Sequence, residues 1–290
     1  MSAPPPAWDV RGRSVMLTGA SSGIGLAGAR ALAALGANLW LVCRSRERGE
    51  AAVAACEAEG GGGKTRLLLA DLASQAAIRR LADDFLRSDE PLHVLVNNAG
   101  AVFFERLLTT DDIESTFAVN HLAPFLLTNL LLPRLRESAP ARVITVASAG
   151  HRTGRIRLDD LESKRKYRAF SQYGNTKLAN VLFTHELARR LEGGSVVAHS
   201  LHPGVVDTNL GMQNSGWFRN VWKAVHPLFS RPETGAQTLV HLVTAPEVQS
   251  QNGGYWSKCR PQRAAARGRD DAMAQALWQK SVELVGLESA

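Results

Sequence analysis

The sequence predicts an α/β protein with a single Rossmann-like, doubly wound domain, in which helices flank both faces of a mostly parallel sheet. Three observations lead to this prediction. A short apolar run at 14–18 passes directly into a glycine-rich turn and an Ala/Leu-rich helix. Further short apolar runs alternate with amphipathic helical patterns, which is typical of parallel βαβ units. Glycines or polar residues follow each predicted strand, where ligands bind in open parallel sheets.

The predicted elements alternate in regular order. The strands are short apolar runs, and the helices repeat apolar residues every three or four positions. In the first part of the chain we expect strands at 14–18, 38–43, 65–70 and 93–96, and helices from the glycine turn to about 35, at 46–59 and at 74–85. In the second part we expect helices at 109–137, 171–191 and 232–244, and strands at 142–147, 195–201 and 255–256.

Composition narrows the possible classes of protein. With 290 residues, of which 45% are hydrophobic and 21% charged, the chain is long enough for a sizeable core. The formal charge is +7, and the basic residues are scattered apart from Arg44, Arg46, Arg48 and a cluster at 258–269. No basic repeat is interleaved with aromatic residues, so an anionic small ligand is expected rather than nucleic acid.

Cysteine usage and the apolar segments indicate a cytoplasmic protein. The three cysteines form neither a disulfide framework nor a zinc-binding pattern. The N-terminus lacks the cationic region and apolar run of a signal peptide. The longest apolar segment, 122–135, is interrupted by two prolines and is shorter than the ~20 residues of a membrane span. We expect it to be a buried helix and the chain to have no integral membrane segment.

Tyr173 and Lys177 are the candidate catalytic pair. Four residues separate them, so a helix places the phenol and the ammonium on one face. A tyrosine that exchanges protons near neutrality needs its pKa lowered by roughly 3, which corresponds to about 4 kcal/mol. A fixed cation beside the phenol acts in that direction. The alternative is an ordinary exposed helix face.

Residues with binding chemistry follow the strands. Gly19, Gly23 and Gly25 permit a tight turn and a close approach of the backbone, so that a pyrophosphate can bind at the N-terminus of the next helix. Their Gly-x-x-x-Gly-x-Gly spacing differs from the general dinucleotide fingerprint, Gly-x-Gly-x-x-Gly. The residues that follow the other strands are Arg44, Asp71, Leu72, Asn97, Asn98, Ala99, Gly100, Ser148, Pro203 and Gly204.

These motifs, in this order, resemble the signature of the short-chain dehydrogenase/reductase family. The motifs that carry the resemblance are Thr18-Gly19-Ala20-Ser21-Ser22-Gly23-Ile24-Gly25, Asn97-Asn98-Ala99-Gly100, Asn120, Ser148, Tyr173-x-x-x-Lys177 and Pro203-Gly204. Within the family, the runs Cys43-Arg44-Ser45 and Val119-Asn120-His121-Leu122 are similar to those of the retinol dehydrogenase group. The resemblance covers about 12–260, which leaves a lead at 1–11 and a C-terminal extension at 261–290.

The resemblance implies a role for individual residues. Ser148 would hold the substrate oxygen, Tyr173 would pass the proton, Lys177 would lower the pKa of Tyr173 and hold the nicotinamide ribose, and Asn120 would hold a water that links Lys177 to solvent. Asp71 would contact the adenine, Asn98 the adenosine side and Thr208 the carboxamide. The complete implied cofactor set is Gly19, Ser21, Ser22, Gly23, Ile24, Gly25, Arg44, Asp71, Leu72, Asn98, Ala99, Gly100, Tyr173, Lys177, Pro203, Gly204 and Thr208.

The sequence departs from the group in two ways. Membrane-bound retinol dehydrogenases carry an N-terminal anchor helix, and no such helix is recognised here, so their location does not transfer. The usual Ser-Ser pair is Ala147-Ser148 in this chain. At the end of the second strand, Arg44 stands where NAD-preferring enzymes place a carboxylate, which favours the 2′-phosphate of NADP(H). The alternative is a solvated surface arginine.

The sequence therefore predicts an NADP-dependent carbonyl reductase or alcohol dehydrogenase. The segment at about 209–231, where the family places a substrate lid, has an apolar helical pattern rich in Trp and Phe, which favours a bulky apolar aldehyde or ketone such as a retinal-like compound. Two alternatives are a reductase of steroid or polyketide-like ketones and a catalytically silent dinucleotide sensor. The resemblance also suggests a homodimer or homotetramer, packed through the helices that begin at Thr109 and Ser171.

Overall fold

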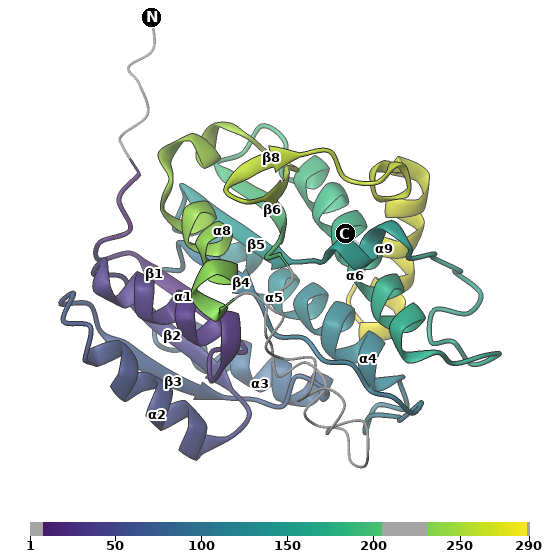
Figure 1. Cartoon of the computed structure of the whole chain (residues 1–290), viewed down its shortest axis with the longest axis horizontal. Helices are drawn as coiled ribbons and strands as arrows, with labels where there is room; N and C mark the ends of the chain where they lie inside the picture. Colours follow the sequence, from purple (N-terminus) through teal and green to yellow (C-terminus); the bar gives the residue numbers. More distant parts are fainter. Residues whose placement is uncertain (1–7, 205–230, 289–290) are drawn as a thin grey trace, which may run out of the picture.

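The computed structural model describes residues 8–204 and 231–288, and its centre is one eight-stranded sheet (Figure 1). The strand order is β3-β2-β1-β4-β5-β6-β7-β8, and every neighbouring pair is parallel except β7 and β8. The predicted doubly wound, mostly parallel sheet is confirmed. The strands are β1 (Ser14–Thr18), β2 (Asn38–Cys43), β3 (Thr65–Leu69), β4 (Val94–Asn97), β5 (Ala141–Val146), β6 (Val196–His202), β7 (Tyr255–Ser257) and β8 (Arg260–Gln262).

Helices cover both faces of the sheet. The α-helices are α1 (Gly23–Ala34), α2 (Arg46–Glu57), α3 (Gln75–Leu86), α4 (Ser115–Phe117), α5 (Ala123–Glu137), α6 (Ala169–Arg190), α8 (Pro232–Thr244) and α9 (Asp271–Val285). Shorter helical turns are η1 (Ala118–Leu122), η2 (Ala149–Arg152), η4 (Pro246–Ser250) and η5 (Ala266–Arg269). Except for the helix expected from Thr109, the predicted elements agree with these bounds to within two residues.

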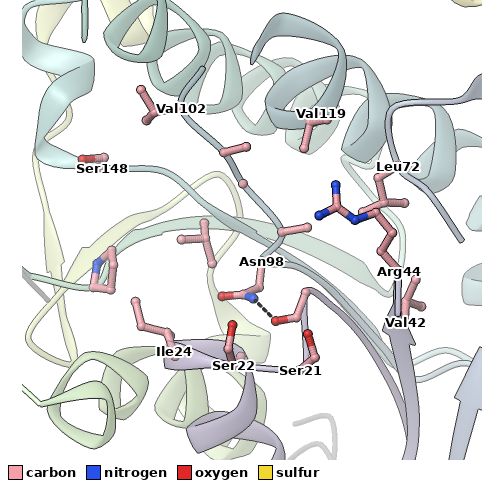
Figure 2. Close-up of a pocket in the computed structure, with 18 of the residues that line it drawn as sticks. Ser21, Ser22, Ile24, Val42, Arg44, Leu72, Asn98, Val102, Val119 and Ser148 are labelled. Carbon is pink, nitrogen blue, oxygen red and sulfur yellow. Dashed lines mark hydrogen bonds between the residues drawn. The ribbon is translucent and has the colours of Figure 1, made fainter. Parts of the chain in front are cut away.

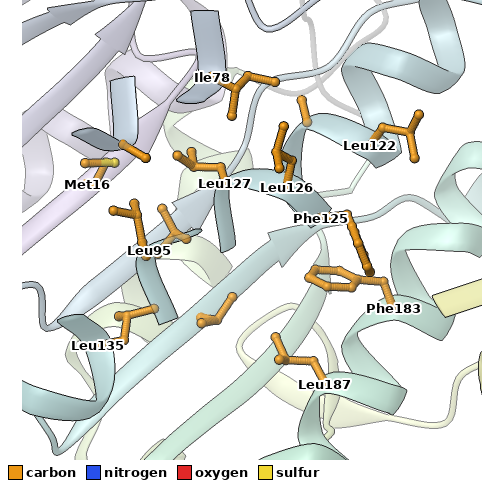
Figure 3. Packing of buried hydrophobic residues seen from close by; sticks show 14 of the residues in the cluster. Met16, Ile78, Leu95, Leu122, Phe125, Leu126, Leu127, Leu135, Phe183 and Leu187 are labelled. Carbon is orange, nitrogen blue, oxygen red and sulfur yellow. The ribbon is translucent and has the colours of Figure 1, made fainter. Parts of the chain in front are cut away.

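The two faces of the sheet build two cores because successive strand residues point to opposite sides. Met16 of β1 joins a cluster with α3, α5, α6 and α9, part of which is shown in Figure 3. Its neighbours Val15 and Leu17 join a second cluster with α1, α2 and α8. All three side chains are fully buried. Each such side chain contributes about 1.5–3 kcal/mol relative to an exposed one, so the core fixes the strand register and thereby the positions of the loops at the strand ends.

The helix expected at 109–137 begins only at Ser115, so this part of the prediction is wrong. The Thr109 hydroxyl accepts the backbone N–H groups of Asp111 at 3.2 Å and Ile113 at 3.4 Å, which folds the preceding residues into a turn. The Glu114 carboxylate then accepts the N–H groups of Thr116 at 2.7 Å and Phe117 at 2.8 Å. Such capping satisfies donors that have no partner inside the helix, so the helix starts after Glu114.

One helical run in the described residues, Ser115–Glu137, is long and apolar enough to cross a membrane, with a mean hydropathy of 1.2. It includes α4, η1 and α5, and 78% of its most apolar window is buried. Phe125 in this run is fully buried against Phe183 and Trp278. The run therefore packs as a central helix of the fold.

Both ends of the described chain are attached to the core. Near the N-terminus, the Trp8 indole donates to the Val243 carbonyl at 2.7 Å, and the Arg142 guanidinium lies 3.6 Å from the Trp8 ring centroid. Helix α9, which the sequence pattern did not reveal, packs along α6 (Figure 1). It starts at an Asp270 cap, which accepts the Met273 N–H at 3.0 Å. The Trp278 ring of α9 lies 4.9 Å from that of Phe125.

Because Trp278 is 7% exposed and fills the core between α5 and α6, Trp278→Ala is expected to lower the free energy of unfolding by about 3–5 kcal/mol. Urea unfolding followed by circular dichroism measures this change. The exposed neighbour provides the control, and Gln279→Ala should change stability by less than about 0.5 kcal/mol. Equal stability of both variants would mean that α9 contributes no core packing.

Candidate active site

A cavity of about 950 Å³ opens at the carboxyl ends of the central strands. Figure 2 shows Arg44 and Ser148 toward opposite ends of it, with Asn98 between them. Thr208 lies outside the described residues, and all the other predicted cofactor residues line this cavity. They are Gly19, Ser21, Ser22, Gly23, Ile24, Gly25, Arg44, Asp71, Leu72, Asn98, Ala99, Gly100, Tyr173, Lys177, Pro203 and Gly204.

The turn after β1 requires glycine at two positions. Gly19 has φ +68°, and a Cβ there would lie 2.9 Å from the Ala99 Cα. A Cβ on Gly25 would overlap the carbonyl oxygen of Gly19. The Asn98 amide donates to the carbonyls of Thr18 at 2.9 Å and Gly19 at 3.2 Å, and so joins the ends of β4 and β1 (Figure 2). The close packing leaves the first turn of α1 on the cavity wall, where backbone N–H groups and the helix dipole suit a pyrophosphate.

The end of the cavity that is lined by Arg44 is basic. Arg44 follows β2 and lines the cavity as predicted, and so does Arg48, which was expected only as part of a basic cluster and not as a cofactor residue. Ser45 caps α2 by accepting the Arg48 N–H at 3.4 Å. Arg46 pairs with Glu50 at 3.4 Å, whereas neither Arg44 nor Arg48 has an ion-pair partner among the described residues. Two exposed guanidinium groups are thus available to a phosphate at this position.

Tyr173, Lys177 and Ser148 lie together at the end of the cavity that is farther from Arg44. Lys177 and Tyr173 are one turn apart on α6, with the Lys177 Nζ 5.5 Å from the Tyr173 ring centroid. The ammonium is 3% exposed and donates to the Val146 carbonyl at 3.0 Å. Ser148 follows β5, is hydrogen-bonded to the Tyr173 side chain, and accepts the Gly150 N–H at 3.2 Å. The three side chains can therefore hold a carbonyl or hydroxyl oxygen and exchange a proton with it.

Burial sets the direction of both pKa shifts. Burial raises the pKa of Tyr173, and the hydrogen bond with Ser148 acts in the opposite direction. Burial lowers the pKa of Lys177 to about 8. The described residues therefore do not produce the expected lowering of the Tyr173 pKa by Lys177. The ammonium is hydrogen-bonded to the backbone at Val146 and stands beside the ring.

Asn120 lies behind the cavity wall, in the π-helical turn η1, and is fully buried. Its amide donates to the Ala101 carbonyl at 2.9 Å and the Thr176 hydroxyl at 3.1 Å, and its oxygen accepts the Ala101 N–H at 2.7 Å. The side chain thus joins the loop after β4 to α6. π-Helical turns inside α-helices are frequent at functional sites.

Several walls of the cavity were missed by the sequence analysis, because their residues are remote in sequence or apolar within loops. The Tyr167 hydroxyl donates to the Phe103 carbonyl at 2.7 Å. The Phe170 ring packs edge-on against that of Phe104, with 5.8 Å between the ring centroids. The missed lining residues include Arg48, Val102, Phe103, Val119, Phe170 and His202. Two of them carried a local signal: Arg48 lies in the first turn after a capping serine, and His202 directly follows the strand predicted at 195–201.

Two buried histidines near the site have structural partners. His151 Nδ1 is 2.7 Å from the Ser148 carbonyl oxygen, and its Nε2 accepts the Ala265 N–H at 3.1 Å. His121 Nε2 is 3.0 Å from the Ser281 hydroxyl of α9. Burial lowers the pKa of both, for His121 to about 4. Both rings connect the site region to the C-terminal part of the chain.

Comparisons with known proteins agree with this geometry. The family model of the short chain dehydrogenases matches residues 13–217. Retinol dehydrogenase 12 of Mus musculus is 40% identical over 280 residues, which cover 97% of this chain and 88% of that protein. Dehydrogenase/reductase SDR family member 13 of Bos taurus is 41% identical over 286 residues, with 96% and 74% covered.

Two solved structures share this fold. A putative uncharacterized protein from Mycobacterium Paratuberculosis has a TM-score of 0.79 and 33% identity, with 98% of this chain and 97% of that chain covered. A short chain dehydrogenase from Burkholderia cenocepacia J2315, solved in complex with NADP, has a TM-score of 0.67 and 28% identity, with 85% and 96% covered.

The sheet, the glycine turn and the Ser148, Tyr173 and Lys177 group define a nucleotide-dependent oxidoreductase of the Rossmann type. The chain belongs to the short-chain dehydrogenase/reductase family and is similar to the retinol dehydrogenases. It is an NAD(P)-dependent oxidoreductase that acts on CH–OH groups.

Proposed function

We propose that the protein interconverts a bulky apolar, retinal-like aldehyde or ketone and its alcohol, with NADP(H) as the cofactor. The observation that carries this proposal is one continuous cavity with Arg44 and Arg48 toward one end and Ser148, Tyr173 and Lys177 at the other. When bound, the nicotinamide ring supplies or accepts the hydride. Ser148 binds the substrate oxygen, and Tyr173 gives that oxygen a proton in reduction and removes it in oxidation.

Lys177 and Asn120 support Ser148 and Tyr173 in the proposed reaction. The Lys177 ammonium holds the nicotinamide ribose and favours the phenolate of Tyr173 once the ring gives up its proton. Asn120 fixes the loop at Ala101 against Thr176, which lies beside Lys177 in α6. We propose that Asn120 also holds the water that returns protons from solvent to Lys177.

The NADP preference rests on charge. A 2′-phosphate beside Arg44 and Arg48 gains two charge-assisted contacts, whereas NADH offers only a hydroxyl there. The Burkholderia cenocepacia relative, which was solved with NADP, supports the proposal. We expect NADPH to bind at least about tenfold more tightly than NADH, a difference of about 1.4 kcal/mol.

Arg44→Asp is expected to reverse this preference, because a carboxylate repels the 2′-phosphate and accepts a hydrogen bond from the ribose hydroxyl. Fluorescence titration with NADPH and NADH measures both dissociation constants. Arg46→Asp is the matched control, since Arg46 pairs with Glu50 and does not line the cavity. Equal affinities of the native protein for the two cofactors would contradict the assignment.

The substrate class rests on apolar walls. Val102, Phe103, Val119 and Phe170 line the cavity. The predicted lid at 209–231 lies outside the described residues, so only its apolar sequence pattern supports it. The name of the retinol dehydrogenase relatives points to the same class.

We expect kcat/KM to rise along a series of straight-chain aldehydes and to be high for retinal, because each buried methylene contributes about 0.8 kcal/mol, or roughly fourfold. NADPH oxidation measures the series, with NADH run in parallel. Phe170→Ala should flatten the rise, while Leu35→Ala, an exposed residue that does not line the cavity, should not. A flat series in the native protein, or faster turnover of short polar carbonyls, would eliminate this substrate class.

We also propose a cytoplasmic location, from the composition of the chain, and a homodimer or homotetramer packed through α5 and α6, from the family resemblance. Light scattering of the purified protein tests the second statement. Fractionation of cells that express it tests the first.

A further inference from the structure

Two stretches of the chain account for its net positive charge. Residues 152–168 hold seven Lys and Arg against three Asp and Glu, and residues 258–269 hold five against none, which gives +9 for the two together. The whole chain carries +7, so the rest of it carries −2. All twelve of these cationic side chains are exposed. We call the exposed residues of 152–168 and 258–269 the basic face.

The two stretches are neighbours in space. The Arg267 guanidinium donates to the Gly154 carbonyl at 3.4 Å, and the Ala265 N–H donates to His151 at 3.1 Å. In Figure 1 η5 and the loop before α6 lie on the same side of the molecule, beside α6 and α9. The two stretches of the basic face therefore adjoin where Arg267 contacts Gly154.

Most of this charge is not neutralised within the protein. Arg165 pairs with Asp159 at 2.7 Å, and Lys164 pairs with Glu162 at 2.9 Å. The other ten cations of the basic face have no ion-pair partner among residues 8–204 and 231–288. These exposed side chains are therefore free to contact an external anion.

Exposed apolar side chains stand beside the same face. The described residues include six large, exposed hydrophobic side chains, and four of them are Leu107, Leu108, Leu158 and Phe170. The loop of Leu107 and Leu108 is attached to the basic stretch, because Arg106 donates to the Glu162 carbonyl at 3.2 Å. Phe170 packs against Phe104 and lines the cavity. Charge and exposed apolar surface therefore meet at one edge of the active-site cavity.

We propose that the basic face, with Leu107, Leu108 and Leu158 beside it, docks the protein peripherally on an anionic lipid membrane. Cations bind the phospholipid headgroups, and leucines insert among the upper acyl carbons. A polyanion such as nucleic acid would use the cations but would leave the leucines in water, which favours the membrane. This inference rests on the proposed function in one respect: docking would let the apolar substrate enter the cavity directly from the bilayer.

The test is sedimentation of the purified full chain with vesicles, without substrate or cofactor, so that its result is independent of the proposed activity. Vesicles of phosphatidylcholine alone are compared with vesicles that contain about one third phosphatidylserine. We expect binding to the anionic vesicles only, and we expect it to weaken at least tenfold when NaCl is raised from about 0.1 M to about 0.5 M. Equal binding to both kinds of vesicle, or to neither, would overturn the proposal.

Two sets of variants separate the contributions. Arg157→Gln, Lys166→Gln and Arg263→Gln together should weaken vesicle binding at least tenfold, since each cation near an anionic bilayer contributes roughly fivefold. The matched control, Lys64→Gln, Arg80→Gln and Arg136→Gln, removes the same charge from exposed positions elsewhere and should change binding less than about twofold. Equal losses in the two triple variants would show that only net charge matters and would contradict the assignment of the basic face as the docking surface.

Leu108→Ser with Leu158→Ser tests the kind of partner. This pair should weaken vesicle binding and leave binding to heparin unchanged, because heparin offers no apolar phase. Unchanged vesicle binding in this variant would reject membrane docking in favour of a general polyanion surface. Thermal unfolding and NADPH oxidation with a water-soluble aldehyde should be the same in all variants, since none of the substituted residues lines the cavity.

Discussion

Tyr173→Phe is expected to lower kcat by at least about a thousandfold and to leave the affinity for NADPH within about twofold. The substitution removes one oxygen and keeps the ring on α6, so the route of the proton is lost while the packing of the ring remains. Stopped-flow measurement of hydride transfer and titration with NADPH give the two quantities separately. Phe at this position also removes the hydrogen bond with Ser148, so the remaining activity reports the loss of both contacts.

The control for this variant is Ser171→Ala, an exposed change in the same turn of α6, which should leave kcat nearly unchanged. A Tyr173→Phe protein that keeps a tenth of the native kcat would remove Tyr173 from the proton route. If cofactor binding fell together with kcat, the residue would have to be assigned to the binding of the cofactor instead.

Lys177→Met is expected to reduce both kcat and NADPH affinity by at least about tenfold each, because the same ammonium holds the ribose and stabilises the phenolate in the proposal. Methionine keeps the length of the side chain and packs as an apolar group, so the helix around it should remain intact. Rapid kinetics and titration check both effects. An unchanged affinity with a lower kcat would restrict Lys177 to the proton transfer.

The difference in stability between the native protein and Lys177→Met is expected to depend on pH. Burial lowers the pKa of Lys177 to about 8, below its usual value, so the unfolded chain binds more protons than the folded protein between about pH 8 and 10.5. The native protein should therefore gain stability relative to Lys177→Met as the pH rises through this window, by on the order of 3 kcal/mol. Denaturant unfolding at several pH values measures the difference. A constant difference would mean that the amine titrates normally.

Some features could be read from the sequence because they depend on local order. The glycine turn after β1 needs residues without a Cβ at fixed spacing, and the pair at 173 and 177 needs only a helix to share a face. The alternation of apolar runs and amphipathic patterns likewise follows from the 2.0 and 3.6 residue periods of strands and helices. For the same reason the strand ends lie where the pattern predicted them, and the predicted cofactor residues within the described part of the chain line the cavity there.

Other features depend on contacts between distant segments, so they become visible only in the folded protein. The helix after Thr109 starts at Ser115 because Glu114 caps it and accepts a further hydrogen bond from Gln172 at 2.8 Å. Phe103 lies in the loop after β4, whereas Arg48, Phe170 and His202 lie at the ends of α2, α6 and β6. All four line the cavity because of the way these segments pack together, which no periodic pattern describes.

The fold class, the glycine turn and the shared face of Tyr173 and Lys177 could be predicted before folding was considered, since each follows from spacing along the chain. The tertiary structure decided the protonation behaviour of that pair. Desolvation depends on which groups surround a side chain, and here burial raises the pKa of Tyr173 and lowers that of Lys177. It also brought 152–168 and 258–269 together into one basic face, because charges far apart in sequence combine only when folding places them side by side.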